Sequence, residues 1–496
     1  MRVGLERWLA PLAVGSIAFA AASVAMLPGL GFWDTAELQT VAPLLGTAHP
    51  TGYPTYVILG FVANVVLTPF GEPALRMNLF AGLCLAVAAA VTADLVRAVT
   101  RSAFLGVAAG IGLALTTVVW RIGLQAEAHA LHLALTAILF RLLIAWEDDR
   151  RDRTLIFAAI VYGLSVGNHS LSLLLAPAIG LFVLAVEPGV LHRPRLMAGA
   201  ALALVATVVL VFLELPLRAG IVRAPLVYGH PETWDGFWYV ALAEQFRGSL
   251  FDPFGDLLGK AAALVGKTVA AFGPLSPLIP IGLVATIVLR PRYALLSGTA
   301  AAITCFFAAS YVNADIDRYY IVPAMIAWTW LAILAGGVAT LVARNLGESR
   351  GPEPVMVLAL AAVLLAPTVA DVPVRLATID RSRDVSARVW VERTLPAMEK
   401  GAVIVSWWSY STPLWYAQLV EGWRTDIRII DDRTRLDENL GGVTDVIDAN
   451  LPIHPVYVIR VDQTEIDGLA SRYDLEYLDG PTAAGLTRVL GRRAGS

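Results

Sequence analysis

The sequence predicts a polytopic α-helical membrane protein with about eleven spans and a small C-terminal α/β domain. Hydrophobic residues make up 57% of the 496 residues, charged residues make up 16%, and the mean hydropathy is +0.67. This composition is too apolar for a soluble globular protein. Long apolar runs fill the chain to about residue 371, and charged residues become frequent after that point.

Apolar runs of roughly 17 to 25 residues, the length that crosses about 30 Å of hydrocarbon, predict the membrane spans. The first run is longer than a signal-peptide core and lacks a clear cleavage site, so we expect it to be retained. The eleven predicted spans lie at 8–28, 76–96, 103–120, 127–146, 154–170, 171–187, 196–217, 261–289, 293–311, 319–343 and 353–371.

One further apolar run, 53–70, is ambiguous, and the distribution of basic residues decides its interpretation. Lys and Arg accumulate in short cytoplasmic loops. If 53–70 does not span, the cytoplasmic side carries every arginine-rich loop, namely 97–101, 150–153, 193–195, 290–292 and 344–350. If it spans, all of these loops fall outside. We therefore expect a re-entrant or interfacial helix over 53–70, within a long first outer loop (29–75) that packs against protein.

If the N-terminus is cytoplasmic and the number of spans is odd, the C-terminal segment lies on the outer side of the membrane. We therefore expect a transmembrane domain over 1–371 and an extracytoplasmic α/β domain over 372–496. In the second domain, short β-branched runs alternate with helical patterns, which indicates a mostly parallel sheet. The expected strands are 402–406, 427–431 and 455–460, and the expected helices are 385–395, 413–421 and 443–449.

The segment Ser406–Tyr410 follows the first of these expected strands and contains two tryptophans. Open sheets bind ligands at the carboxyl ends of their strands, so this segment is a candidate acceptor-binding site. The alternative is that its tryptophans dock the domain on the membrane or on the first outer loop. The domain has no glycine-rich phosphate loop, which argues against a nucleotide site.

Polar residues of the apolar region gather at the predicted outer face. An ionisable group in apolar surroundings is costly unless it has a partner or a function, so we expect these loops to converge on one cleft. Taken singly, each residue could instead be a helix cap or an interfacial side chain. The set comprises Asp34, Glu37, His49 and Tyr53 in the first outer loop, Gln125, Glu127 and His129 at the fourth span, Asn168 and His169 between the fifth and sixth spans, Arg218 and Arg223 after the seventh, and Asp315, Asp317, Arg318, Tyr319 and Tyr320 between the ninth and tenth.

Other site chemistries have weaker support. His129 and His132 could face one another on a helix, but the usual zinc spacings are absent. A Mg or Mn ion bridging Asp34 or Glu127 to a phosphate is the better alternative, because hard oxygen ligands suit these ions, yet no cofactor is firmly implied. No Gly-x-Ser-x-Gly motif frames a hydrolytic triad. The net charge of −3 and the lack of a basic stripe argue against nucleic acid.

Four short motifs occur in one order along the chain. They are DTAEL at Asp34–Leu38, AHPTGYP at Ala48–Pro54, QAE at Gln125–Glu127 and GNHS at Gly167–Ser170. This pattern resembles the GT-C superfamily of membrane glycosyltransferases, and within it the family of the transmembrane protein O-mannosyltransferase and its bacterial relatives. The resemblance covers mainly residues 8–190. Two positions depart from the family pattern, where Thr51 replaces a second proline and Ser170 replaces a second histidine.

The resemblance implies an enzyme that takes a monosaccharide, mannose in the family, from a polyprenyl-phosphate donor. It also implies that the sugar is transferred with inversion to a hydroxyl group, which belongs to a protein Ser or Thr or to an envelope glycan or lipid. An acidic residue of the first outer loop would be the base. The residue chemistry agrees, since a lipid phosphate is already a competent leaving group and one carboxylate suffices. We expect Asp34 to be that base. Glu37, one helical turn on, would support it or orient the acceptor, and swapped roles stay open.

Arginines are expected to neutralise the donor phosphate, with Arg318, Arg218 and Arg223 as candidates. His49 and His169 would donate to phosphate or sugar hydroxyls. The rest of the predicted substrate-binding set is Tyr53, Gln125, Glu127, Asn168 and Tyr319. The excess of Arg over Lys and the abundant Ala and Gly are typical of a GC-rich bacterial genome. We therefore expect a bacterial inner (plasma) membrane protein whose active site and C-terminal domain are extracytoplasmic.

Two other classes of protein stay open. A lipid-linked sugar transporter or flippase would also have many spans with charged residues, and it would show charges within spans and paired broken helices. A non-catalytic scaffold for envelope proteins would present the C-terminal domain to its partners. The gathering of charge at one face and the lack of an obvious internal repeat favour the glycosyltransferase.

Overall fold

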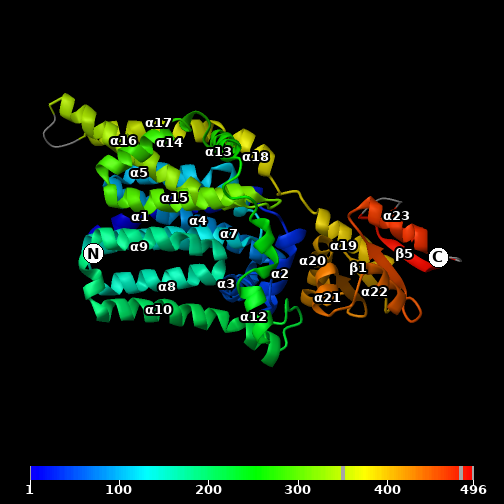
Figure 1. Cartoon of the computed structure of the whole chain (residues 1–496). Coiled ribbons are helices and arrows are strands. Elements are labelled where there is room, and N and C mark those ends of the chain that lie inside the picture. Colours follow the sequence, from blue (N-terminus) through cyan, green and yellow to red (C-terminus); the bar gives the residue numbers. More distant parts are fainter. Residues whose placement is uncertain (1, 348–351, 480–483, 494–496) are drawn as a thin grey trace.

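The computed structural model of the chain describes residues 2–347, 352–479 and 484–493. The chain forms a long helical bundle and a separate C-terminal lobe that stands at one end of it (Figure 1). The bundle helices are α1 (Arg2–Ala25), α4 (Pro73–Thr100), α5 (Ala103–Ala114), α6 (Thr117–Ile122), α7 (Ala128–Asp149), α8 (Asp152–Asn168), α9 (Ala176–Val186), α10 (Pro194–Phe212), α13 (Leu257–Phe272), α14 (Leu278–Leu289), α15 (Pro291–Ser310), α16 (Ile321–Asn345), α17 (Pro354–Ala370) and α18 (Val372–Ile379).

All eleven predicted apolar runs form helices, which confirms the polytopic helical class. Among the described residues, six helices are long and apolar enough to cross a membrane, or up to eight if each of two bent pairs is one span. The run predicted at 103–120 is divided into α5 and α6, and the run at 171–187 begins with the 3-10 turn η2 (Ser170–Leu175) before α9.

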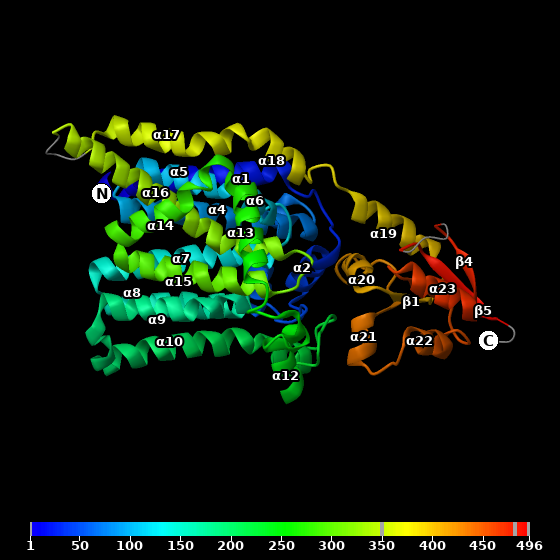
Figure 2. The same ribbon diagram turned by 45° about the horizontal axis from the view of Figure 1, so that its top comes forward.

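The predicted span 261–289 is not one straight helix, which corrects that expectation. α13 and α14 meet at 83° through the short turn η6 (Gly273–Leu275). Gly273 adopts φ +53°, a conformation that glycine accepts readily, and prolines follow it at 274 and 277. As a result, α13 lies across the direction of the other bundle helices (Figure 2). α17 and α18 form a second bent pair, at 42°.

The first connection after α1 contains α2 (Trp33–Leu44), α3 (Pro54–Val66) and η1 (Thr68–Phe70). α3 corresponds to the ambiguous run and is 13 residues long, too short to cross about 30 Å of hydrocarbon at 1.5 Å per residue. Its first half is buried, including Tyr56 and Val57, whereas Val65 and Val66 near its end are exposed. This length agrees with a helix that does not span.

The arginine-rich loops meet at the end of the bundle that holds the N-terminus. Arg292 pairs with Glu147 at 3.3 Å, and Arg150 Nη1 donates to the Val186 carbonyl at 2.6 Å. Residues 348–351 of the last such loop lie outside the described residues. α2, α3 and the C-terminal lobe lie at the opposite end, called here the α2 end (Figures 1 and 2). The connections at the α2 end also include α11 (Glu214–Pro216), η4 (Leu217–Ile221), α12 (Trp234–Ala241), η5 (Glu244–Ser249) and η7 (Ile316–Tyr320).

The C-terminal lobe holds a five-stranded sheet of order β2-β1-β3-β5-β4. β2, β1 and β3 run parallel, as predicted, and β4 and β5 add an antiparallel hairpin that the sequence did not reveal. The lobe contains α19 (Ser386–Ala397), β1 (Val403–Ser406), α20 (Trp408–Trp415), η8 (Tyr416–Val420), β2 (Arg428–Asp431), α21 (Asp432–Asp437), α22 (Val443–Asn450), β3 (Val456–Ile459), α23 (Gln463–Arg472), β4 (Tyr473–Tyr477) and β5 (Thr487–Arg492).

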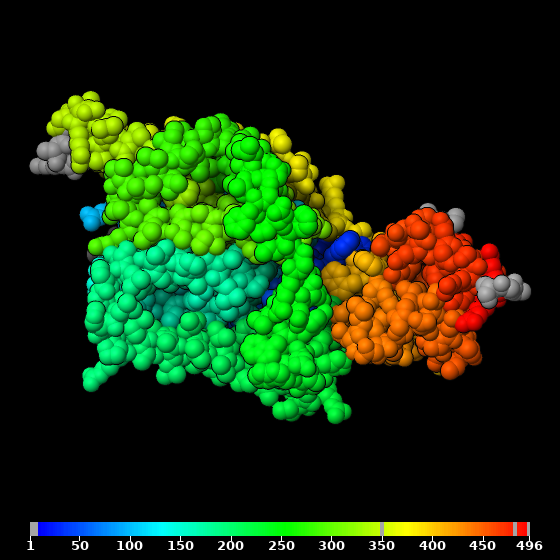
Figure 3. All heavy atoms as spheres, viewed as in Figure 1, coloured from blue at the N-terminus to red at the C-terminus, as the bar shows by residue number. Residues whose placement is uncertain are grey.

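The lobe is joined to the bundle by a hydrophobic core. Leu30, Ala36 and Ala74 from the bundle side share one buried cluster with Leu414 and Tyr416 of the lobe. The Tyr416 hydroxyl accepts a hydrogen bond of 2.9 Å from the backbone N–H of Ala74. The space-filling view shows the two parts in contact along the α2 end (Figure 3). Since interfaces between freely moving domains are usually more polar, this contact indicates a fixed position for the lobe.

Candidate active site

α2 carries the two carboxylates of the first motif in different surroundings. Asp34 lies in its first turn, where a negative charge interacts favourably with the helix dipole, and its side chain is 24% exposed. Glu37, one turn on, is fully buried. The two acids therefore differ in access to an incoming molecule, although they lie on one helix.

Arg318 joins Asp34 to the third motif. It comes from η7, and its Nη1 lies 2.8 Å from Asp34 Oδ2 and 3.2 Å from Glu127 Oε2. Glu127 is the N-cap of α7 and accepts from the backbone N–H of His129 at 3.2 Å and from its Nδ1 at 2.7 Å. Burial alone would raise the pKa of Glu127, but the charge of Arg318 and the bonds from His129 outweigh it and hold that pKa well below its usual range.

Glu37 forms a second chain of contacts with the second motif. Its Oε1 accepts from the backbone N–H of His49 at 2.9 Å, and its Oε2 pairs with His49 Nδ1. His49 Nε2 lies 2.9 Å from the Tyr53 hydroxyl. Burial lowers the pKa of His49, but the charge and hydrogen bond of Glu37 outweigh it, so the pKa is raised above its ordinary value. The imidazole is thereby favoured in its protonated form.

A group of aromatic and histidine rings lies between the contacts of Arg318 and the contacts of Glu37. The rings of His129 and His169 lie 4.6 Å apart, and Tyr53 and Tyr319 lie 5.5 Å and 6.1 Å from His169. His129 Nε2 is buried without a hydrogen-bond partner among the described residues. A buried polar atom of this kind is costly to leave unpaired, which marks it as a candidate contact for a ligand.

The structure brings together most of the predicted site residues and separates three. The cluster holds Asp34, Glu37, His49, Tyr53, Glu127, His169, Arg318 and Tyr319. Gln125 instead accepts from Arg381 at 2.6 Å, and Asn168 donates to the Ala128 carbonyl at 3.0 Å. Arg218 donates to the carbonyls of Leu44 and Leu45, both at 2.7 Å, at the C-terminal end of α2.

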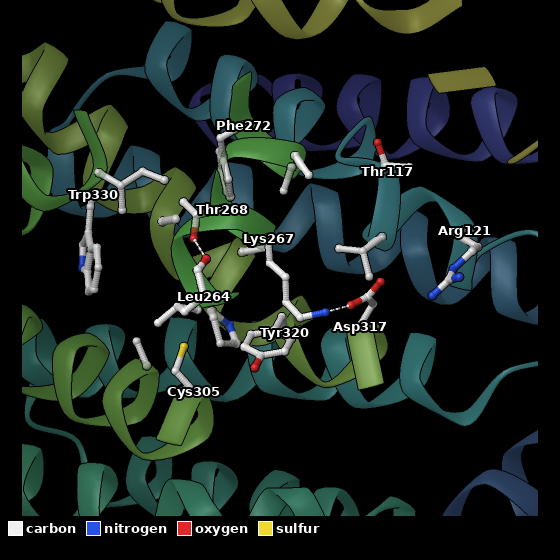
Figure 4. A pocket seen from close by; sticks show the side chains of 18 of the residues that line it. Thr117, Arg121, Leu264, Lys267, Thr268, Phe272, Cys305, Asp317, Tyr320 and Trp330 are labelled. Atoms are coloured by element: carbon white, nitrogen blue, oxygen red, sulfur yellow. Dashed lines mark hydrogen bonds and ion pairs between the residues drawn. The ribbon is translucent and has the colours of Figure 1, made fainter. Parts of the chain in front are cut away.

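A large apolar cavity lies beside the cluster. Its volume is about 660 Å³, and its lining comes from α6, α13, α14, α15, α16 and α18 together with η7. Lys267 and Arg121 are its basic residues, and Figure 4 shows Asp317 between them. Lys267 pairs with Asp317, and Arg121 pairs with Asp315 at 2.6 Å.

η7 thus separates the cavity from the cluster. Asp317 and Tyr320 line the cavity, whereas Arg318 and Tyr319, between them in the sequence, contact the cluster. A segment with no regular apolar periodicity can present neighbouring residues in different directions in this way. The cavity and the carboxylates are therefore adjacent through a few residues of backbone.

Sequence reasoning missed several residues that the structure brings to this region. Lys267 could have been identified from the sequence, because it lies within a predicted apolar span, where a charged side chain without a function is energetically costly. Trp408 contacts the first outer loop, one of the placements that the sequence left open, and its ring lies 5.9 Å from that of His49. Tyr228, which accepts from Trp408 Nε1, lies in a connection with no motif.

A metal site is not formed by the described residues, since no group of three His, Cys, Asp or Glu side chains there is placed to hold an ion. Arg318 pairs with both Asp34 and Glu127, the two acids that were candidates for bridging a Mg or Mn ion to a phosphate. The two acids therefore share one fixed cation of the protein.

Comparisons with known proteins agree with the geometry. Over 98% of both chains, the fold matches the crystal structure of ArnT from Cupriavidus metallidurans bound to undecaprenyl phosphate, with a TM-score of 0.59 and 12% identity. The apo structure of the same protein matches with a TM-score of 0.59 and 12% identity over 97% of this chain and 96% of that one. At 12% identity these matches show that the chain has the fold of ArnT.

More narrowly, residues 34–189 match the family model of the protein O-mannosyl-transferase TMEM260 N-terminal domain. The mouse protein O-mannosyl-transferase TMEM260 is 40% identical over 96 residues, which are 18% of this chain and 13% of the mouse protein. The chain therefore matches only a small part of that relative. The family resemblance inferred from the four motifs is confirmed, and all four lie inside the matched range.

Proposed function

We propose that this protein transfers a monosaccharide from a polyprenyl-phosphate donor to an acceptor hydroxyl at the outer membrane face, with inversion. One observation carries the proposal: a partly exposed carboxylate, Asp34, lies beside a buried ionic cluster and next to an apolar cavity with basic residues. A carboxylate and an apolar cavity with cations are the parts that transfer from a lipid phosphate requires.

Asp34 is the base in this proposal, and Glu37 is its support. Glu37 is fully buried and uses both oxygens to bind His49. Asp34 is 24% exposed and contacts Arg318 through Oδ2. In the reaction, Asp34 takes the proton of the acceptor hydroxyl, whose oxygen attacks the anomeric carbon from the face opposite the phosphate. The bond from that carbon to the phosphate oxygen breaks, and polyprenyl phosphate leaves with the electron pair.

The cavity is the proposed donor site. Its volume of about 660 Å³ falls within the roughly 300–1,000 Å³ of typical small-molecule sites. Its apolar walls suit the first isoprene units, and Lys267 and Arg121 can bind the phosphate by charge-assisted hydrogen bonds. Arg318 would act beside them, near the reacting bond, whereas Arg218 is occupied at the end of α2. The solved structure of ArnT with undecaprenyl phosphate supports a lipid phosphate as the donor class.

The name of one relative suggests the first sugar and acceptor to test. The mouse relative is named a protein O-mannosyl-transferase, so mannose and a protein Ser or Thr hydroxyl are the first pair to test, with envelope glycans and lipids after it. We place the protein in a bacterial plasma membrane with the α2 end and the C-terminal lobe outside, as the distribution of arginines predicts. No cofactor is part of the proposal.

The test uses the purified full chain in lipid nanodiscs and a panel of radiolabelled polyprenyl-phosphate sugars. We expect one donor to bind and to lose its sugar to an acceptor peptide or glycan, with inverted anomeric configuration by NMR. If no donor in the panel binds or is consumed, the proposal is wrong.

A transporter or flippase remains the second candidate, because the 83° break between α13 and α14 resembles the broken helices of transporters. The same nanodisc preparation separates the two candidates, since a flippase moves labelled donor across a liposome membrane without breaking the bond to the sugar.

A further inference from the structure

The C-terminal lobe reaches the proposed active site through α20. α20 and η8 pack against α2, the helix that carries Asp34 and Glu37. The shared core described above fixes this contact. The carboxyl ends of β1 and β2 lead into α20 and α21, so the edge of the sheet that usually binds ligands faces α2.

Trp408, the first residue of α20, covers one side of His49. Its ring lies 5.9 Å from the imidazole at an interplanar angle of 86°, an edge-to-face contact. Its Nε1 donates to the hydroxyl of Tyr228. The imidazole is therefore held by Glu37 and Tyr53 through its two nitrogens and by Trp408 through its ring, which leaves it 13% exposed.

Arg433, in α21, holds the segment on which Tyr228 lies. Its guanidinium is 3.3 Å from the centre of the Tyr228 ring, a close cation–π contact. Its Nη1 donates to the Val227 carbonyl at 3.0 Å and to Asp437 at 2.9 Å. Asp437 in turn accepts from the Gly229 N–H at 3.0 Å. Two residues of the lobe thus bind three consecutive residues of the bundle side.

Glu37 acts on this group electrostatically. Burial, and then the charge of Glu37, raise the pKa of Tyr228 well above its ordinary value. Burial lowers the pKa of Arg433, but Tyr228 and the nearby acids, Glu37 among them, outweigh it. Arg433 is therefore a cation within electrostatic reach of Glu37, and it is also paired with Asp437 in its own lobe.

Residues of the lobe enclose part of the Glu37–His49 pair, since α20 packs against α2 and Trp408 contacts His49. Asp34 and Glu127 share Arg318, so the direct ionic partner of Glu37 is His49, whereas Arg433 pairs with Asp437 of its own lobe. A buried carboxylate without compensating charge is strongly disfavoured. We infer that Trp408 and Arg433 are positioning residues that hold the Glu37–His49 pair beside Asp34, so that the C-terminal lobe completes the active site. The inference rests on the proposed function.

The experiment compares variants of the full chain in nanodiscs, with donor affinity, kcat and acceptor KM measured separately. The donor cavity has no lining residue beyond Ile379 among the described residues, so changes in the lobe should leave the donor Kd within about twofold. We expect Trp408→Ala and Arg433→Met to lower kcat by roughly ten- to a hundredfold, the cost of a misplaced group. Tyr228→Phe, which keeps the ring under Arg433 and removes the acceptor of Trp408 Nε1, should give a smaller loss.

Conservative and remote variants serve as controls. Trp408→Phe keeps an aromatic edge against His49 and should retain more activity than Trp408→Ala. Arg428→Met removes a surface arginine of the same lobe that is 57% exposed and pairs with Glu438, and it should behave as wild type.

The outcomes separate this inference from the proposed function. Lower kcat with unchanged donor binding supports it. Equal losses of donor binding and turnover would mean that the lobe acts only on folding and would overturn it, as would normal turnover of both main variants. A wild-type chain that transfers no sugar would overturn the proposed function itself.

Discussion

Replacing the proposed base tests the mechanism most directly, and the structure predicts that Asp34→Asn separates catalysis from folding. The substitution keeps the shape of the side chain and removes its ability to accept a proton. Loss of a general base costs about 10²- to 10⁴-fold in rate, which is about 3–5 kcal/mol of transition-state stabilisation. We expect kcat to fall by that factor while the donor Kd stays unchanged, because Asp34 does not line the cavity.

The effect on stability should be much smaller. Arg318 keeps its contact with Glu127 at 3.2 Å after the change, and an asparagine oxygen can still accept from its Nη1. The substitution then replaces one charge-assisted hydrogen bond by a neutral one, which lowers the free energy of unfolding by about 1 kcal/mol. Thermal unfolding in detergent, followed by intrinsic fluorescence, would show only a modest downward shift.

The assay is transfer of labelled sugar to acceptor at saturating donor, together with equilibrium donor binding. Asp371→Asn is a matched control, since this acid is 47% exposed, lies at the end of α17 and pairs with Arg375. A variant Asp34→Asn that turns over within about threefold of wild type would refute the assignment of the base. Loss of donor binding in that variant would refute the separation of base and donor site.

Three further predictions follow from other parts of the structure. Lys267→Met should weaken binding of undecaprenyl phosphate by about 10- to 100-fold, the value of a charge-assisted hydrogen bond, whereas Asp317→Asn, which frees Lys267, should bind at least as tightly as wild type in the same radioligand assay. The pKa of Glu127 is lowered on folding, so its ion pair stabilises the folded protein at pH values above the ordinary glutamate pKa. This stabilisation is lost as the pH falls through the lowered pKa. Glu127→Gln should therefore unfold at a lower temperature than wild type at pH 7, and the difference in unfolding temperature should shrink below about pH 4. In a cysteine-free background, Leu436→Cys, at a position 73% exposed on the lobe, should react with an impermeant maleimide added outside intact cells, while Arg151→Cys should not, and the reverse result would invert the predicted orientation.

The sequence predicts the helices and the core of the site because both depend on local patterns. Apolar runs indicate burial in lipid or protein, and the distribution of arginines, not the length of the run, predicted that the segment containing α3 does not span. Asp34, Glu127 and His169 lie in motifs inside the range that the family model matches. Their convergence could be expected because each follows or precedes a span at one face.

The rest depends on contacts between distant segments, which no local pattern encodes. Arg318 was identified only as a candidate for binding phosphate, and its contacts with two acids that lie far from it in the sequence could not be predicted. Arg218 contacts the end of α2 because that helix stops close to η4. The part of the lobe in the site rests on Trp408 and Arg433, whose shared partner Tyr228 lies in a connection without a motif.

The position of η7 has a further consequence for the order of events. In the proposed mechanism, a phosphate that draws Lys267 away from Asp317 would alter the charge next to Arg318, the residue that follows Asp317 in the chain and lies 2.8 Å from Asp34. Arrival of the donor would then be coupled to the ion pair that holds Asp34. An enzyme without donor would keep this carboxylate paired with Arg318 and free it only when a sugar is in place for transfer.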